Sequence, residues 1–115
     1  MHETGLAIEI ANLALEALLE DQAAGKVKAL HLKVGRWSGV EPETLSFALG
    51  VVMDGTELEG AKVEIELIEP TFDCASCGRR FTAENRFDLC PFCGGAPGAM
   101  VGGEELMLTH LDLED

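Results

Sequence analysis

Four cysteines, the only ones in this chain of 115 residues, form two closely similar pairs. The first pair is Cys74 and Cys77, the second is Cys90 and Cys93, and a glycine follows each pair. Two residues between the thiols let both sulfurs turn toward one point, and the glycine can adopt a positive φ angle. Four sulfur ligands suit a tetrahedral Zn²⁺ whose coordination shell is full. The pattern therefore predicts a structural zinc site.

Other uses of these cysteines are less consistent with the sequence. Disulfides would need an oxidising compartment, and the N-terminus lacks the basic region, apolar core and cleavage site of a secretory signal. A thioredoxin-like redox pair would usually stand alone near a βαβ pattern. An iron tetrathiolate, as in rubredoxin, has the same spacing logic, so a rubredoxin-like electron carrier stays open as an alternative.

The composition indicates an acidic protein, which we expect in the cytoplasm. The chain is 47% hydrophobic, which is enough for a compact core, and no apolar run approaches the length of about 18 residues that a membrane helix needs. Its formal net charge is −13, and only three arginines (Arg79, Arg80 and Arg86) lie in the cysteine segment. Binding to a phosphate backbone depends on Lys and Arg replacing counterions, so we expect neither a nucleic-acid nor a membrane partner.

Apolar spacing predicts a first helix over residues 4–24, with Thr4 as N-cap and Gly25 as the C-terminal stop. A period of 3.6 residues defines its expected core stripe. The stripe consists of Leu6, Ile10, Leu13 and Ala17, widened by Ile8, Leu15 and Leu19.

Alternating residues then predict a strand over residues 27–34, with Leu30, Leu32 and Val34 on one face. A loop over residues 35–40 leads to a second helix that starts at Pro42 and carries Leu45, Leu49 and Val52. Asp54-Gly55 and Glu59-Gly60 indicate turns. A second half-buried strand contains Val63, Ile65 and Leu67, and residues 104–113 again look extended, with Leu106 and Leu108 on one face.

This order predicts an α+β fold. A two-stranded sheet is marginally stable, so we expect the last strand to return and complete a third. The expected architecture is two helices packed on a small three-stranded mixed sheet, with an inserted tetracysteine zinc-ribbon module. Residues 1–70 and 104–115 would form one domain, and residues 71–103 the inserted zinc-binding domain.

The chain begins Met1-His2-Glu3, which is a second possible metal site. We expect Met1 to be retained, because a bulky second residue normally blocks its removal. The α-amino group, the His2 amide nitrogen and the His2 imidazole can form fused chelate rings around one ion. Such nitrogen-rich, tetragonal geometry favours Ni(II) or Cu(II) over zinc. Alone, this signal is weak, since a histidine at position 2 is usually an exposed residue in a frayed terminus.

The N-terminal tripeptide, the segment from Val34 to Ala48 and the two cysteine pairs together resemble the HypA/HybF family of nickel-insertion proteins for NiFe-hydrogenases. The segment VGRWSGVEPETLSFA is similar to the family pattern Gly-x-x-Ser-x-Val-x-Pro-x-x-Leu-x-Phe. The resemblance covers essentially the whole chain. It implies a non-enzymatic nickel metallochaperone that receives Ni(II) transiently and delivers it to the hydrogenase large-subunit precursor, with a GTPase accessory protein as a further partner.

The resemblance also implies which residues bind each metal. Nickel would lie at His2, with the amine of Met1 and with Glu3 beside it, and zinc would lie at Cys74, Cys77, Cys90 and Cys93. A zinc-ribbon adaptor with an inert N-terminus remains the alternative from another functional class. Glu41 could lend an oxygen to nickel or cap the second helix, and Trp37 could anchor its loop or contact a partner. His31 and His110 are interpreted as ordinary surface or edge residues.

Overall fold

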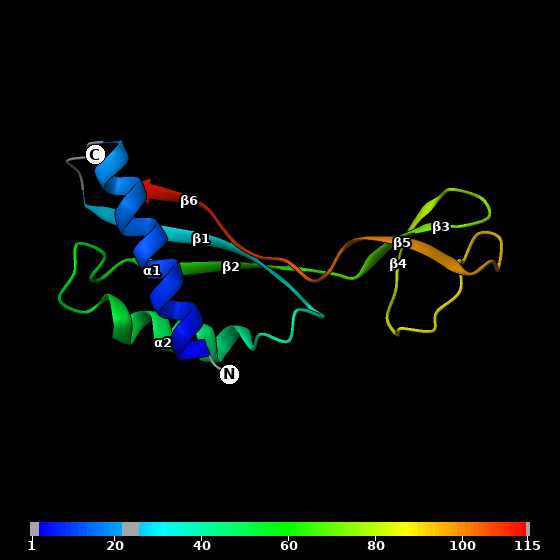
Figure 1. Ribbon diagram of the computed structural model, residues 1–115, viewed down its shortest axis with the longest axis horizontal. Coiled ribbons are helices and arrows are strands. Elements are labelled where there is room, and N and C mark those ends of the chain that lie inside the picture. The colour runs from blue at the N-terminus through cyan, green and yellow to red at the C-terminus, as the bar shows by residue number, and fades with distance from the viewer. Residues whose placement is uncertain (1–2, 22–25, 115) are drawn as a thin grey trace.

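The computed structural model describes residues 3–21 and 26–114, which form two helices and six strands. The molecule is elongated, 52 × 28 × 18 Å, with the helices at one end and the cysteine-bearing strands at the other (Figure 1). The elements are α1 (Glu3–Glu20), β1 (Val27–Gly35), α2 (Pro42–Met53), β2 (Lys62–Ile68), β3 (Thr71–Cys74), β4 (Arg80–Thr82), β5 (Pro97–Gly102) and β6 (Leu106–Leu113).

The larger sheet has the strand order β2-β1-β6. Strand β1 pairs in parallel with β2 and antiparallel with β6. Parallel neighbours need a long crossover connection, and α2 supplies it between β1 and β2. The predicted three-stranded mixed sheet, including the return of the C-terminal strand, is confirmed.

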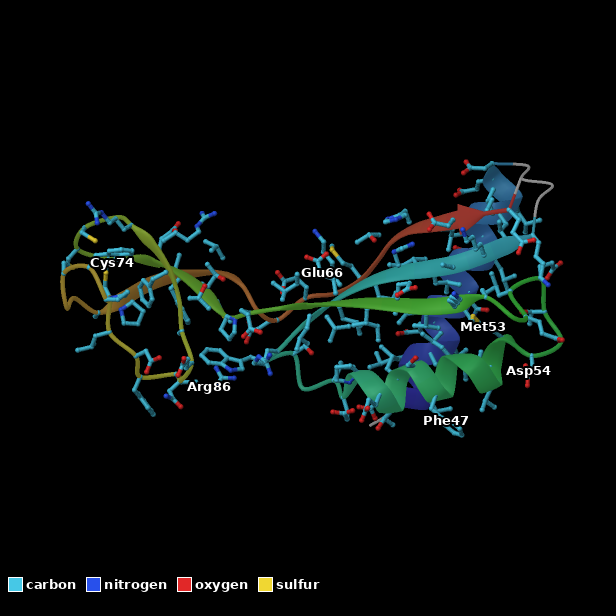
Figure 2. All side chains as sticks on the ribbon, turned by 180° about the vertical axis from the view of Figure 1, so that it is seen from behind. Phe47, Met53, Asp54, Glu66, Cys74 and Arg86 are labelled. Carbon is cyan, nitrogen blue, oxygen red and sulfur yellow. The ribbon has the colours of Figure 1, made fainter. Side chains whose placement is uncertain are left out.

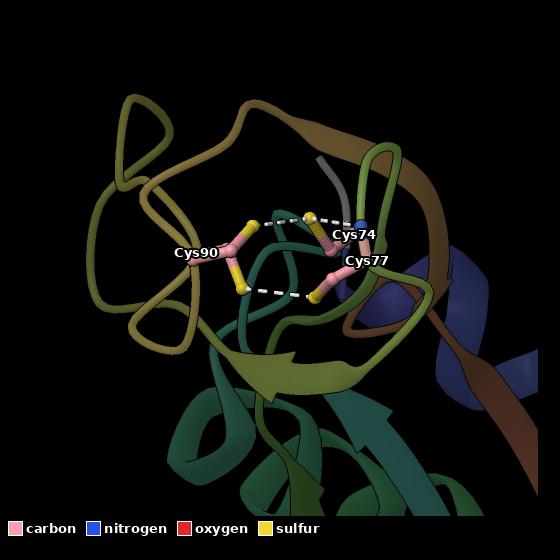
Figure 3. Close-up of side chains that lie close together, drawn as sticks. Cys74, Cys77 and Cys90 are labelled. Carbon is pink, nitrogen blue, oxygen red and sulfur yellow. Dashed lines mark hydrogen bonds between the residues drawn. The ribbon is translucent and has the colours of Figure 1, made fainter.

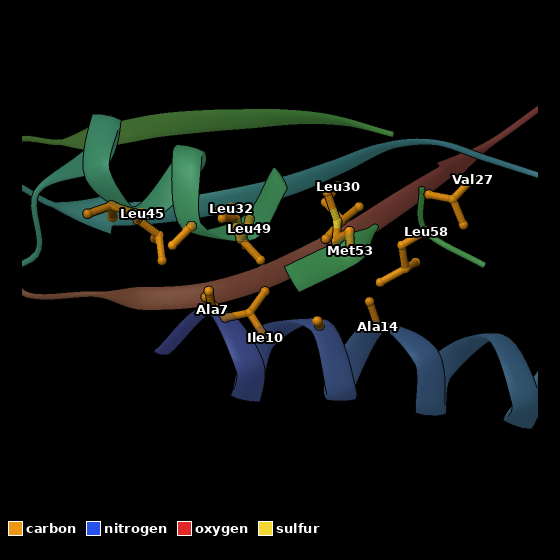
Figure 4. Packing of buried hydrophobic residues seen from close by; sticks show 13 residues of the cluster. Ala7, Ile10, Ala14, Val27, Leu30, Leu32, Leu45, Leu49, Met53 and Leu58 are labelled. Atoms are coloured by element: carbon orange, nitrogen blue, oxygen red, sulfur yellow. The ribbon is translucent and has the colours of Figure 1, made fainter. Parts of the chain in front are cut away.

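Both helices cover one face of this sheet, and the main core lies between the helices and the sheet (Figure 4). Leu30, Leu32 and Val34 point from β1 into the core and are at most 1% exposed. Leu45 and Leu49 of α2 meet them there, both fully buried. The predicted apolar faces of β1 and α2 are therefore confirmed.

The predicted core stripe of α1 is confirmed in part. Ile10 is buried, and Leu6 and Leu15 pack against the core. Leu13 is 54% exposed, however, and Ile8 and Leu19 are exposed as well. The other buried residues are alanines, whose small side chains let α1 lie close to its neighbours. The helix also starts at Glu3, so Thr4 lies inside it, and it ends at Glu20, before the predicted residue 24. Gly25 lies outside the described residues.

Helix α2 begins as its sequence predicts. Pro42 occupies the first turn, and the Glu41 side chain accepts a hydrogen bond from the Glu43 N–H at 2.9 Å. A proline without an N–H suits this position, and the carboxylate satisfies an amide that the helix leaves unpaired. The capping role considered for Glu41 is thus confirmed.

The smaller sheet has the order β4-β3-β5, with both pairings antiparallel. Cys74 is the last residue of β3, and Cys77 lies in the turn that leads to β4. Strand β5 forms within the glycine-rich segment 94–103, where the sequence pattern predicted no strand. The chain enters this sheet from β2 and leaves it into β6, as expected for an insertion (Figure 1). The exact boundary at residues 71 and 103 remains a prediction.

The two sheets meet where β1 ends. The N–H of Gly35 donates to the carbonyl of Glu105 at 2.7 Å, and the N–H of Trp37 donates to the carbonyl of Gly103 at 2.7 Å. A side chain at position 35 would collide with the backbone of Gly103 and Glu104. Only glycine allows the two backbones to approach this closely.

We predict that Gly35→Ala lowers the free energy of unfolding by about 3 kcal/mol, since the added methyl group meets backbone atoms that cannot rotate away. Gly50→Ala is the control, because nothing lies within 4 Å of a Cβ at that position of α2. It should stabilise the protein by up to about 1 kcal/mol, the helix preference of alanine over glycine. Denaturant unfolding measures both, and equal stability of Gly35→Ala and wild type would contradict the close approach.

Candidate metal centres

The four cysteine sulfurs converge, each lying within 4.8 Å of the others. Sγ of Cys74 is 3.5 Å from Sγ of Cys93, and Sγ of Cys77 is 3.7 Å from Sγ of Cys90 (Figure 3). Sulfurs that share a tetrahedral zinc ion at about 2.3 Å lie about 3.8 Å apart, whereas a disulfide bond is about 2.05 Å long. The spacing therefore fits a tetrahedral ion and not a pair of disulfides.

The two cysteine pairs have the same local backbone geometry. In the first, the Gly78 N–H donates to the Cys74 carbonyl at 3.1 Å, and in the second, the Gly94 N–H donates to the Cys90 carbonyl at 2.8 Å. The glycines have φ angles of 77° and 76°. This left-handed conformation is costly for other residues, and it turns the chain back so that both thiols point inward. The glycine after each pair, noted in the sequence, therefore has a structural cause.

Backbone amides stabilise negative charge on the sulfurs. The N–H groups of Cys77 and Ser76 donate to Sγ of Cys74 at 3.4 and 3.3 Å, and they lower the pKa of Cys74 to about 6. The Gly95 N–H also lowers the pKa of Cys93, but the sulfur of Cys74 beside it and partial burial outweigh that effect and raise the pKa to about 11. Four thiolates repel one another unless a cation lies between them, so this donor set favours a divalent ion.

A small apolar cluster supports the cysteines. It comprises Cys74, Phe81, Ala83 and Cys90, with Phe72 and Trp37 packed against it. Trp37 comes from the loop after β1, and its ring lies 6.1 Å from that of Phe72. The guanidinium of Arg86, at the same end of the molecule as Cys74 (Figure 2), lies 4.4 Å above the Trp37 ring. Of the two roles considered for Trp37, the structure shows the anchoring one.

The start of α1 lies beside the start of α2. Oε2 of Glu3 accepts a hydrogen bond from the Glu41 N–H at 3.2 Å, and this bond lowers the pKa of the Glu3 carboxyl. The half-buried Glu3 carboxylate therefore contacts the backbone of Glu41, whose own exposed carboxylate caps α2. Met1 and His2, the predicted nickel ligands, lie outside the described residues.

A second potential metal-binding group escaped the sequence analysis. His31, His110 and Asp112 present ligand atoms that all lie within 4.8 Å of one another. The two histidines do lie on the sheet surface as predicted, but neither periodicity nor spacing in the sequence indicates that β1 and β6 bring them together. The only available signal was the His-x-Asp spacing, which is too common to indicate a site.

In the described part of the chain, no helix is long and apolar enough to cross a membrane.

Comparison with known proteins identifies the family. Residues 1–113 match the profile of the family described as "Hydrogenase/urease nickel incorporation, metallochaperone, hypA". The chain belongs to the HypA family.

Relatives in this family match along their whole length. Hydrogenase maturation factor HypA of Cereibacter sphaeroides (strain KD131) is 39% identical over 118 residues, which cover 99% of this chain and 100% of the relative. The factor of the same name from Chlorobium limicola is 34% identical over 115 residues, covering 100% and 98%. The family description is that of a metallochaperone, and these relatives are named as maturation factors.

Solved structures support the fold. The solution structure of the Ni metallochaperone HypA from Helicobacter pylori has a TM-score of 0.68 and 19% identity, covering 98% of this chain and 97% of that one. A second solution structure, of a protein named HypA, has a TM-score of 0.72 with 99% and 97% covered.

Loss of the ion should disorder the cysteine module, because its strands are short and its apolar cluster is small. Cys77→Ser should release zinc and shift the fluorescence of Trp37, the single tryptophan in a chain without tyrosine, toward that of a solvated indole. Ser76→Ala is the control, since it leaves all four sulfurs in place. Elemental analysis and emission spectra measure the effects. Native zinc content and native emission in Cys77→Ser would contradict the site, and a red protein with an iron-thiolate absorption band would favour the rubredoxin-like alternative.

Proposed function

We propose that this protein is a nickel metallochaperone that binds Ni(II) at its N-terminus and helps to deliver it to the NiFe-hydrogenase large-subunit precursor. The observation that carries the proposal is the match of residues 1–113 to a nickel-incorporation family, which includes both the N-terminal tripeptide and the four cysteines. A GTPase of the maturation machinery is the proposed second partner, and the cytoplasm the proposed location. Transfer proceeds by ligand exchange and needs no catalytic residue.

The proposed nickel ligands are the amine of Met1, the amide nitrogen and imidazole of His2, and Glu3. Nitrogen donors in a tetragonal arrangement suit Ni(II). The Glu3 carboxylate supports the proposal, because a glutamate is ionised at neutral pH and the hydrogen bond from the Glu41 N–H, which lowers its pKa further, holds the start of α1. Glu41 keeps an exposed carboxylate nearby that could supply a further oxygen.

We propose that the four cysteines hold zinc and that this zinc is structural. Four thiolates fill the tetrahedral shell, so no position remains for water or for a transferred ion. Residues 71–103 would then form a zinc-binding domain whose task is to keep its shape. Residues 1–70 and 104–115 would form the domain that carries nickel.

Nickel affinity should depend on the free N-terminus. An N-terminal extension converts the amine into an amide, and His2→Ala removes the imidazole, so each change should abolish Ni(II) binding at the N-terminal site. Zinc content and thermal unfolding should stay nearly unchanged. Calorimetric titration of tag-free protein and the two altered forms is the measurement. Equal affinity in all three would refute the N-terminal site.

The role of Glu3 can be tested separately. Glu3→Gln keeps an oxygen that can accept the hydrogen bond from Glu41 but removes the charge. If Glu3 binds nickel, the substitution should weaken Ni(II) binding at least about tenfold, the scale on which even outer-shell partners of a metal act. Glu9→Gln, which removes an exposed charge from the same helix, is the matched control. Equal losses of Ni(II) affinity in the two variants would show that Glu3 is not a nickel ligand. Its role would then be limited to the hydrogen bond between α1 and the start of α2.

A further inference from the structure

The face of the larger sheet opposite the helices carries a compact group of polar side chains. His31 on β1 lies directly opposite His110 on β6, and their rings stack with centroids 4.0 Å apart and planes 10° apart. Nε2 of His31 lies 2.7 Å from Oδ2 of Asp112, and Nε2 of His110 lies 3.9 Å from Oδ1 of the same carboxylate. Two imidazole nitrogens and a carboxylate therefore face one point.

A β-bulge creates this arrangement. The register of β1 and β6 shifts between the pairs His31–His110 and Leu32–Leu108, which leaves Thr109 as an extra residue on β6. Under strict alternation, His110 would share the inward face of Leu108. The bulge reverses the alternation, so His110 and Asp112 face outward beside His31, while Leu111 packs against the core.

The bulged residue also orients one ring. The hydroxyl of Thr109 donates to the carbonyl of His31 at 3.0 Å and lies 3.1 Å from Nδ1 of His110. Because the hydroxyl proton goes to the carbonyl, its oxygen accepts the Nδ1–H of His110. In the neutral ring, the lone pair of His110 is then on Nε2, on the side of Asp112. Metal-binding histidines are typically held by such a hydrogen bond from the other ring nitrogen.

We propose that His31, His110 and Asp112 form a binding site for one divalent late transition-metal ion, separate from the cysteine centre and from the N-terminal residues. Imidazole and carboxylate donors suit Ni(II), Zn(II) or Co(II). Glu64, which pairs with His31 across β1 and β2, adds negative charge on the same side. An open cavity of about 420 Å³, lined by both histidines, Thr109, Lys33 and Glu64 among others, gives an ion and its waters room to enter.

Binding requires a small rearrangement of the side chains. Donors that share an ion at about 2.1 Å lie at most about 4.2 Å apart, and the three ligand atoms lie within 4.8 Å of one another, so a shift of about half an ångström brings them into range. The ion must also lie near both ring planes, so the parallel stack has to open. The proton on Nε2 of His31, now donated to Asp112, moves to Nδ1 or to solvent as the metal takes its place. All three side chains are partly exposed, at 29% for His31, 58% for His110 and 48% for Asp112, so these rotations meet little packing resistance.

The competing explanation is that the stack and the ion pair only hold β1 against β6. The test uses full-length, zinc-loaded protein that carries both an N-terminal extension and His2→Ala, so the proposed N-terminal site cannot contribute. Ni(II) is titrated by calorimetry and followed through the imidazole NMR signals of the two remaining histidines. We expect one equivalent to bind, both imidazole signals to broaden or shift together, and the zinc content to stay constant.

Substitutions in that background decide between the explanations. His31→Ala, His110→Ala and Asp112→Asn should each weaken Ni(II) binding at least about tenfold, and Thr109→Val should weaken it less than these. Glu66→Gln is the matched control for Asp112→Asn, because it removes one charge from a residue that lines the same cavity. Its affinity should stay within about twofold of the parent, since a nearby charge contributes far less than a ligand. Failure to bind nickel, unperturbed imidazole signals or equal losses in Asp112→Asn and Glu66→Gln would overturn the proposal. None of these results bears on the N-terminal site, which is tested separately by the titration of tag-free protein.

Discussion

Strand β1 lies between β2 and β6, and its three surfaces serve three different parts of the molecule. Its inward side chains form the centre of the core that both helices cover. Its last residue, Gly35, permits the backbone contact through which the two sheets join. Its outward face places His31 on the surface of the sheet opposite the helices. A change in the register of β1 by one residue would exchange the inward and outward faces, so core and surface chemistry depend on the same pairing.

The cysteine module has a small core of its own and is extended by a residue from the loop after β1. Its strands are three to six residues long, and four residues make up its buried cluster. So little apolar burial does not stabilise a fold without a metal or other cross-link. Trp37 lies in the loop after β1, outside the cysteine module in sequence. Its ring packs against Phe72 and Arg86 and so extends this cluster. Order in the module and order in that loop are therefore linked, and the same loop leads directly to Glu41 at the start of α2.

Much of this structure could be predicted from the sequence, because the relevant signals are local. The spacing of the cysteines predicted their convergence, the alternation in residues 27–34 predicted β1, and Pro42 marked the start of α2. The core stripe of α1 was predicted only in part. Ile10 is buried as expected but Leu13 is exposed, because a period of 3.6 residues does not say whether leucines or alanines lie nearest the core when the helix is close to its neighbours. The meeting of His31 and His110 could not be predicted either. It requires both the pairing of strands more than 70 residues apart in sequence and the bulge at Thr109, and neither leaves a local signal.

The chemistry of the donors separates retention of a metal from its transfer. Four thiolates enclose an ion completely and bind it through the softest ligands in the chain, so an ion held there exchanges slowly and can serve as a structural cross-link. A cargo ion needs donors that can be replaced one at a time by those of an acceptor. In the proposed function, the nitrogen and oxygen donors of residues 1–3 meet that need, and Glu3 accepts a hydrogen bond from the backbone of Glu41. The two proposed donor sets come from separate segments of the sequence, residues 1–3 and 74–93, so an ion at one does not have to displace the ion at the other.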